Sequence, residues 1–535
     1  MLDTLLADGT VTRPSKHPAP ARVAPPTQLA FLNTLIIHPS YTSRASEPTN
    51  LHVAARALAY LRGVLEITGP IHANLRYAFT FNRRPRRDGR DSRSTSRYHT
   101  RYSSPPLHDD EANSSDSDNV EGRLANEQSV WQGAGNFWAV LGWAFRCAAA
   151  HPERWRHWKV WLEYMVDVLE KDWDERFALD AEQNGVEGSQ STQAGEWKML
   201  NESLLVAYFD DLHRGGDILK GVLRALMAFT DDDPIDKGAY REVFERELAV
   251  ITGNSKRKRA ATTGEPEANQ LGSLMDWAEE DDLEESEDDE DDDEFTSRPS
   301  SPSIGKKKSA RVSRGKKAKQ AGSSPSAAIF RVTEGMADSV SIRLRIFRLL
   351  SAAACYIPER FCPLADLYDK FADRVCNLPL AMFRPFIDSL SSISVTSVYV
   401  SLYRRFAERL LPNNCPDPSD VDSSTDEADG LSFDLLGKCF LPFAASRVMA
   451  EDNAKLSLIL ESMLWFIYQN SPVTKAEATR LGKAAEKGIK AREERIKKRN
   501  ANVSAADREA REVLQRSARS MRIFIQVAGG DSKAR

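Results

Sequence analysis

Two clusters of Lys and Arg carry the first recognisable chemistry in this 535-residue chain. They are Lys256, Arg257, Lys258 and Arg259, and then Lys306, Lys307 and Lys308 with Lys316 and Lys317. Extended basic side chains at this density pair with the acidic grooves of an import receptor, so both clusters predict entry into the nucleus. The plainer interpretation is charge balance against the acidic residues that lie between them.

Nearly every residue from Glu279 to Glu294 carries a carboxylate. Dense blocks of like charge repel one another and bury no apolar surface, so we expect 254–325 to be a disordered basic-acidic-basic linker. An aromatic residue stands close to each end of the acidic run, namely Trp277 and Phe295.

Aromatic anchors beside dense carboxylates resemble the acidic motifs with which histone chaperones hold histones, where the acid steers the partner and the ring fills a pocket. This resemblance implies binding of histones or other basic partners. The contact residues that we expect are Trp277, Asp288, Asp289, Asp291, Asp292, Asp293, Glu294 and Phe295. A solvating spacer is the simpler alternative.

Five serines in these polar stretches are predicted phosphorylation sites. Ser115, Ser117 and Ser286 lie among acidic residues that suit an acidophilic kinase, and Ser301 and Ser324 each precede a proline. Phosphate at these positions would add negative charge.

The stretch Lys483–Arg499 near the C-terminus is strongly basic. It could follow the phosphates of a nucleic acid and lose affinity steeply with salt. It lacks interleaved aromatic residues, so base stacking is not indicated. The alternatives are a solvated helix rich in charge, and a third import signal at 497–499.

One spacing suggests catalysis. Arg146 and His151 have the RxxxxH spacing of HEPN ribonucleases, which are helical proteins; the resemblance implies that Arg146 holds phosphate and His151 acts as acid or base. The residue after the arginine, usually polar in that family, is Cys147 here, and Pro152 ends the helix at once. Arg146 as a surface ion-pair residue and His151 as a helix cap are the more ordinary roles.

Other catalytic signatures are missing from the sequence. All nine histidines precede Arg214 and all but one of the six cysteines follow it, which predicts no metal site. The HExxH, Walker A and GxSxG patterns are absent. We therefore expect a protein that is not an enzyme and has no cofactor.

The elements around these segments should all be helices. Apolar residues recur with the helical period in both halves of the chain, and seven of the ten tryptophans fall between Trp131 and Trp173. We expect a buried helix over 137–145, an amphipathic helix over 158–169 and a short helix over 240–251. In a helix from about Ile342, Arg343 should face away from the apolar side. No alternating strand pattern is present.

We predict an all-α protein with two helical lobes, arranged as a bundle or an irregular α-solenoid of helical hairpins. The expected divisions are a disordered tail (1–26), helices of the N-terminal lobe (27–82), a disordered insert (83–128), the Trp-rich core of that lobe (129–253), the linker (254–325), a helical C-terminal lobe (326–470) and a basic, solvated helical tail (471–535).

Scattered cysteines, no secretory signal and no long apolar run indicate an intracellular protein without a membrane span. We expect a nuclear scaffold or adaptor that binds proteins in a chromosome-associated complex for DNA repair, chromatin handling or segregation. The alternative is a nucleolar ribosome-assembly factor that binds RNA through its basic tail, and the ribonuclease is a distant third.

Overall fold

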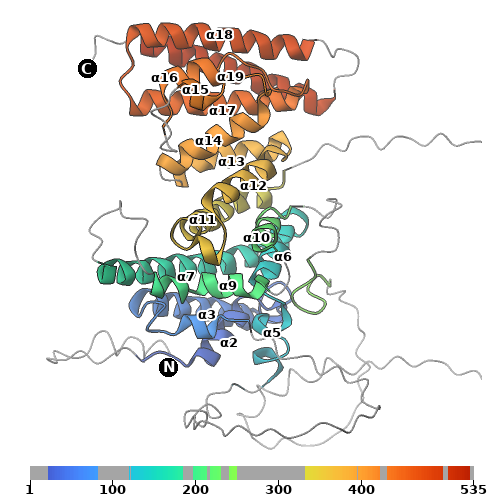
Figure 1. The fold of residues 1–535 in the computed structure, drawn as a ribbon. Coiled ribbons are helices and arrows are strands. Elements are labelled where there is room, and N and C mark those ends of the chain that lie inside the picture. The colour runs from blue at the N-terminus through green and yellow to red at the C-terminus, as the bar shows by residue number, and fades with distance from the viewer. Residues whose placement is uncertain are drawn as a thin grey trace, which may run out of the picture. The chain divides into compact units, whose positions relative to one another are not determined.

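The computed structural model describes residues 22–81, 120, 122–184, 197–213, 217–229, 240–249, 332–393, 396–421, 430–497 and 504–530. These residues form helices and loops and contain no strand, as the sequence predicted (Figure 1). They all belong to one compact unit, which the segments 1–255 and 330–535 form together. The predicted linker, 254–325, lies outside the described residues.

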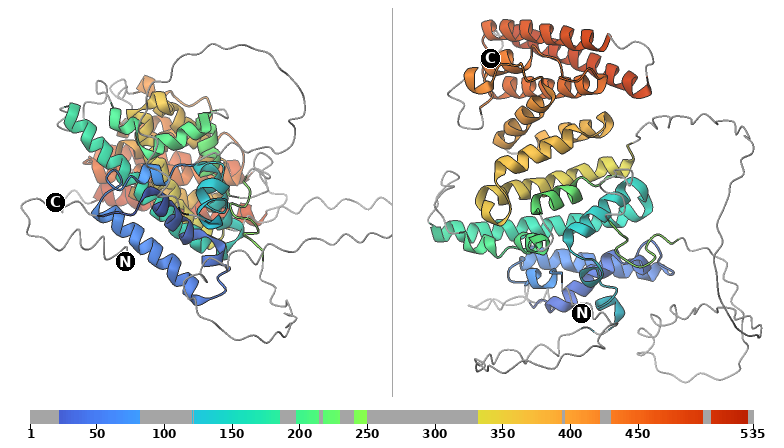
Figure 2. Two further views of the ribbon diagram at one scale, coloured as in Figure 1. Left: turned by 90° about the horizontal axis from the view of Figure 1, so that it is seen from below. Right: turned by 45° about the vertical axis from the view of Figure 1, so that its right-hand side comes forward.

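The N-terminal lobe is built on two long, adjacent helices, α6 and α7 (Figures 1 and 2). Its elements are α2 (Pro26–Ile37), η1 (Pro39–Tyr41), α3 (Pro48–Ile67), α4 (Leu75–Ala78), η2 (Arg123–Ala125), α5 (Val130–Gly133), α6 (Phe137–Ala150), α7 (Pro152–Asn184), α8 (Lys198–Asn201), α9 (Leu204–His213) and α10 (Ile218–Leu226). Pro152 opens α7 at a first helical position, where the missing N–H costs nothing.

Tryptophan side chains form the centre of this lobe, as predicted. All seven between Trp131 and Trp173 are buried, and Trp158 and Trp161 are fully so. The indole N–H of Trp161 donates to Asn33 Oδ1 at 2.7 Å, and that of Trp138 donates to the Tyr208 carbonyl at 2.9 Å. The rings thus bury large apolar areas and most of their indole N–H groups find an acceptor, although that of Trp155 has none among the described residues.

The C-terminal lobe continues as packed helices. Its elements are α11 (Glu334–Tyr356), η4 (Pro358–Arg360), α12 (Leu364–Cys376), α13 (Leu380–Ile393), α14 (Thr396–Leu410), α15 (Pro418–Val421), α16 (Phe433–Leu435), the π-helix η6 (Leu436–Phe440), α17 (Ala450–Asn470), α18 (Lys475–Lys497) and α19 (Ala505–Gly530). In Figure 1, α17, α18 and α19 lie side by side, and α19 packs against both of the others. No helix among the described residues is long and apolar enough to cross a membrane.

The short helix predicted over 240–251 is wrong for the part that is described. Residues 240–249 form bends and turns, with Arg246 in the left-handed region at φ +52°. The carboxylate of Glu247 turns back to accept the backbone N–H groups of Val243 at 3.2 Å and Phe244 at 3.3 Å. Tertiary contacts therefore override the local helical pattern in this segment.

Glu247 is fully buried and joins this loop to the tryptophan core. It accepts the indole N–H groups of Trp143 at 3.0 Å and Trp158 at 2.8 Å, and it forms an ion pair with Arg154. Arg154 also donates to the carbonyl of Ile37, the last residue of α2. A buried charge pair is tolerable here because its partners satisfy both ions.

A second buried arginine joins the two lobes. Arg343 of α11 is fully buried, which contradicts the prediction that it faces away from the apolar side. Its guanidinium donates to Ser339 Oγ, to the carbonyl of Leu226 at the end of α10, and to that of Ala228. Burial lowers the pKa of this group well below its usual value, although arginine stays protonated in proteins.

No carboxylate pairs with Arg343 among the described residues, so its charge is balanced in other ways. The guanidinium carbon lies 3.8 Å from the ring centre of Phe145 and 4.0 Å from that of Phe229, between two negative ring faces. The two carbonyls belong to the C-terminal end of α10, which carries partial negative charge. Together these groups replace an acidic partner.

Other contacts between the lobes surround Arg343. Arg345 donates to Asp167 at 2.7 Å and also pairs with Glu170, which in turn accepts from Arg348 at 2.8 Å. A Cβ on Gly335 would lie 2.5 Å from the Ala148 carbonyl oxygen, so only glycine allows α11 to begin against α6. The lobes therefore pack together through polar pairs and close backbone contact.

Replacing Arg343 by methionine should destabilise the chain by about 2–5 kcal/mol, because all three of its guanidinium nitrogens donate to buried acceptors that would lose their donor. The matched control is Arg492→Met. Arg492 is equally buried, but it reaches the Leu441 and Phe443 carbonyls through one nitrogen, and its other two nitrogens have no partner among the described residues. Its loss should cost about 1 kcal/mol or less. Urea midpoints of the two variants measure both; equal shifts would contradict this account.

Candidate functional site

The predicted import, basic-partner and phosphorylation residues all lie outside the described residues. They belong to 82–119 and 250–331, so the structure brings none of them together. The three predictions therefore stand on the sequence alone.

Arg146 and His151 serve the packing of the N-terminal lobe. Arg146 is buried, which corrects the expected surface position, and it donates to the Tyr240 carbonyl at 2.9 Å. His151 is the C-terminal cap residue of α6, as the ordinary interpretation predicted, and burial lowers the pKa of its imidazole. Both roles fit the lobe without a bound substrate.

The basic tail is helical, but it is not solvated all round as predicted. In α18 the residues Ala478, Leu481, Ala485, Gly488 and Ile489 lie on a buried face, which Arg492 and Ile496 extend. A Cβ on Gly488 would approach the Leu441 carbonyl oxygen to 1.8 Å, so the helix lies directly against η6. Several residues on this buried face are small, so the sequence shows no clear apolar periodicity there.

The outer face of α18 keeps the predicted basic character. Lys483, Lys487 and Lys490 are exposed and follow one another at helical spacing. Arg492 does not contribute, because it points into the core. An anionic partner can therefore contact fewer basic residues than the segment Lys483–Arg499 contains.

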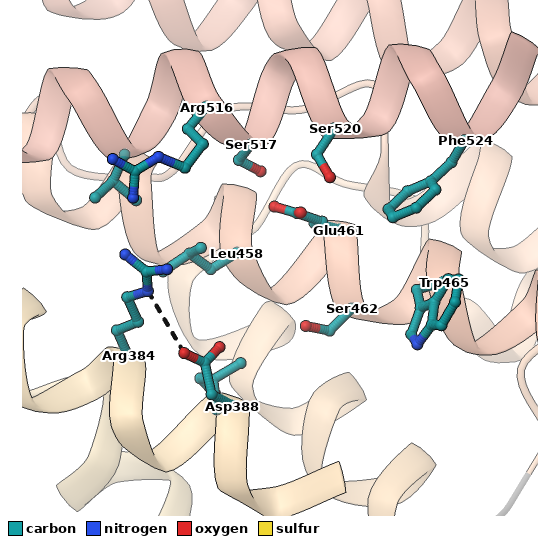
Figure 3. Close-up of a pocket in the computed structure, with 12 residues that line it drawn as sticks. Arg384, Asp388, Leu458, Glu461, Ser462, Trp465, Arg516, Ser517, Ser520 and Phe524 are labelled. Carbon is teal, nitrogen blue, oxygen red and sulfur yellow. Dashed lines mark ion pairs between the residues drawn. The ribbon is translucent and has the colours of Figure 1, made fainter. Parts of the chain in front are cut away.

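A groove on the C-terminal lobe is the main surface feature that the sequence did not predict. It consists of two open hollows of about 370 and 540 Å³, which are neighbours because Arg384, Asp388 and Val513 line both. Helices α13, α17 and α19 line it. Figure 3 shows the side chains of α19 directed across the groove toward those of α13 and α17.

One end of the groove is aromatic. Trp465 of α17 and Phe524 of α19 lie with their ring centres 5.4 Å apart, and 45% of Trp465 is exposed to solvent. Beside them Ile523 and Val527 expose more than half of their surface. Large apolar side chains that remain exposed together are typical of a protein-binding site.

The middle of the groove carries charges of both signs. Arg384 and Asp388 form an ion pair with each other at 3.5 Å. Arg516 and Glu461, which line the same hollow, form no ion pair with any residue that the structure describes. A partner with complementary charges can satisfy both.

The sequence pointed only partly to this groove. In the sequence, Val513, Leu514 and Ile523 indicate a last helix, and Ser504 followed by Asp507 is typical of its start. The structure confirms the cap: Ser504 Oγ accepts the Asp507 N–H at 3.1 Å. Helical spacing cannot distinguish an apolar residue that packs against another helix from one such as Trp465 that remains exposed.

Comparisons with protein-family models, curated proteins and solved structures find no match to this chain.

Replacing Trp465 by alanine should cost about 1 kcal/mol of stability or less, because the side chain is already half exposed. Trp161→Ala should cost about 3–5 kcal/mol, since this residue is fully buried and hydrogen-bonded. Urea denaturation of both variants measures the difference. If both substitutions cost the same, Trp465 belongs to the folding core and not to a free groove.

Proposed function

We propose that this protein is a non-enzymatic nuclear scaffold or adaptor that works by protein–protein contact in a chromosome-associated complex, such as one for DNA repair, chromatin handling or segregation. The observation that carries the proposal is the groove between α13, α17 and α19, with its exposed Trp465 beside the half-buried Phe524.

The groove suits a protein better than a small molecule. Small-molecule sites are concave and bury most of their ligand, whereas these hollows are open and rimmed by charged side chains. An exposed aromatic side chain beside polar and charged ones is a feature of protein interfaces.

The sequence adds the cellular setting. The basic clusters at 256–259 and 306–317 support recognition by an import receptor, and the acidic run with Trp277 and Phe295 supports a basic partner such as a histone. A protein partner in the groove and a basic partner on the acidic run could be held at the same time.

The tagged full chain should concentrate in the nucleus and co-purify with chromosome-associated proteins. Replacing Trp465 and Phe524 by alanine should remove at least part of this set, and Trp277→Ala with Phe295→Ala should abolish recovery of core histones. Quantitative mass spectrometry of the purified complexes measures both effects.

The control for the groove is Leu51→Ala with Val53→Ala, which removes exposed apolar side chains from α3 and should leave the partners unchanged. A chain that remains in the cytoplasm would overturn the nuclear part of the proposal. Equal recovery of every partner by both variants would overturn the role of the groove.

The exposed lysines of α18 favour a second candidate, a nucleolar ribosome-assembly factor that binds RNA. Charge reversal of Lys483, Lys487 and Lys490 to glutamate should weaken binding of single-stranded RNA and reduce the salt slope by about 0.7 per lost phosphate contact. Fluorescence anisotropy across a salt series measures both. Reversing Arg56, Arg62 and Lys220, which are exposed elsewhere, gives the same change in charge and should have little effect.

A further inference from the structure

The larger of the two hollows lies where the described chain resumes after residues 250–331. Val332, the first residue after that gap, itself lines the hollow together with residues of α13 and α19. The next residue is fixed in place, because Thr333 Oγ donates to the Ala148 carbonyl at 2.9 Å and accepts the Met336 N–H at 3.2 Å. The residues that precede Val332 are therefore tethered to the edge of this hollow.

Part of the wall of this hollow is apolar. The apolar side chains are those of Val332, Leu380, Ala381, Pro385 and Val513. Pro385 lies inside α13 and has no N–H, so the Ala381 carbonyl one turn earlier cannot accept the usual helical hydrogen bond. An occupant with apolar side chains and a backbone N–H would suit this wall.

The rest of the lining is charged and carries more acid than base. It consists of Arg384, Asp388 and Glu509. Arg384 and Asp388 pair with each other at 3.5 Å. Glu509 is exposed and forms no ion pair with any residue that the structure describes. A cation on the occupant would therefore find a carboxylate to pair with.

The three residues before Val332 have this chemistry in the sequence. They are Ile329, Phe330 and Arg331, an apolar pair followed by a cation, and they lie outside the described residues. A chain spans at most about 3.6 Å per residue, so the Cα of Phe330 can lie no further than about 7 Å from that of Val332. A tether this short gives an effective concentration of at least about a millimolar, at which even a weak site is filled.

The length of the hollow also suits this segment. Its α13 side extends from Leu380 to Asp388, which is about 12 Å at 1.5 Å per residue. Three or four residues of extended chain span the same length.

We propose that the segment 329–331 of this chain occupies the larger hollow, with its two apolar side chains against α13 and Val513 and its guanidinium against Glu509. Because Arg384, Asp388 and Val513 line both hollows, the docked segment would border a partner bound at Trp465. The inference does not rest on the proposed function, since the occupant comes from the chain itself.

Limited digestion of the purified full chain with trypsin tests this docking, because Arg331 is a cleavage site and cleavage follows the population in which a segment is open. Cleavage after Arg331 should be at least about tenfold slower than cleavage after Lys319 in the predicted linker. Replacing Ile329 and Phe330 by serine should raise the rate after Arg331 at least about tenfold and leave the rate after Lys319 unchanged. Mass spectrometry of the fragments over time measures both rates.

A change on the hollow itself provides the second arm. Glu509→Arg should also accelerate cleavage after Arg331, because like charges then face each other. Its matched control is Glu512→Arg, the same change at an exposed position of α19 that lines neither hollow, and it should have no effect. Synthetic peptides covering 324–336, with and without the two serines, correct for the preference of trypsin for neighbouring residues.

Cleavage of the wild type that is as fast after Arg331 as after Lys319 would overturn the inference. So would slow cleavage that neither the serine pair nor Glu509→Arg accelerates, because the nearby start of α11 then limits the protease. Protection that grows with protein concentration would place the segment of a second copy in the hollow, and protection only in the presence of a partner would place another protein there. Either result contradicts docking within one chain.

Discussion

Buried carbonyl groups at the ends of helices impose the main constraint on this structure. The last turn of every helix has carbonyls without an intrahelical donor, and packing helices closely removes the water that would satisfy them. This chain meets the demand repeatedly with buried arginines. Arg154 donates to the end of α2, Arg343 to the end of α10, and Arg492 to carbonyls just after η6. The forked guanidinium suits this task because it can reach two carbonyls at once.

These arginines differ in how their charge is balanced. Arg154 has the buried carboxylate of Glu247, and Arg343 has two aromatic faces and the end of α10. Arg492 is the least satisfied of the three, and burial lowers the pKa of its guanidinium to about 10. The contacts of Arg343 lie where residues after 331 return to the helices before 250. The compact unit therefore depends on a contact between distant parts of the sequence.

The proposed function follows from where apolar side chains are left exposed. Most aromatic residues that the structure describes pack inward, and Trp465 is one of the few with a large exposed fraction. The hollow that Trp465 lines is also lined by Arg516 and Glu461, which form no ion pair with any residue that the structure describes.

The sequence by itself determined the helical class, the tryptophan core and most helix positions, because apolar spacing and proline or serine at helix starts act locally. It also located the charged segments, since composition alone identifies them. Only the tertiary structure decided that Arg343 and Arg492 are buried, that 240–249 turns around Glu247, that α18 packs on one face and that Trp465 borders a groove. Each of these features depends on which distant part of the chain packs beside the residue, and helical periodicity does not identify that neighbour.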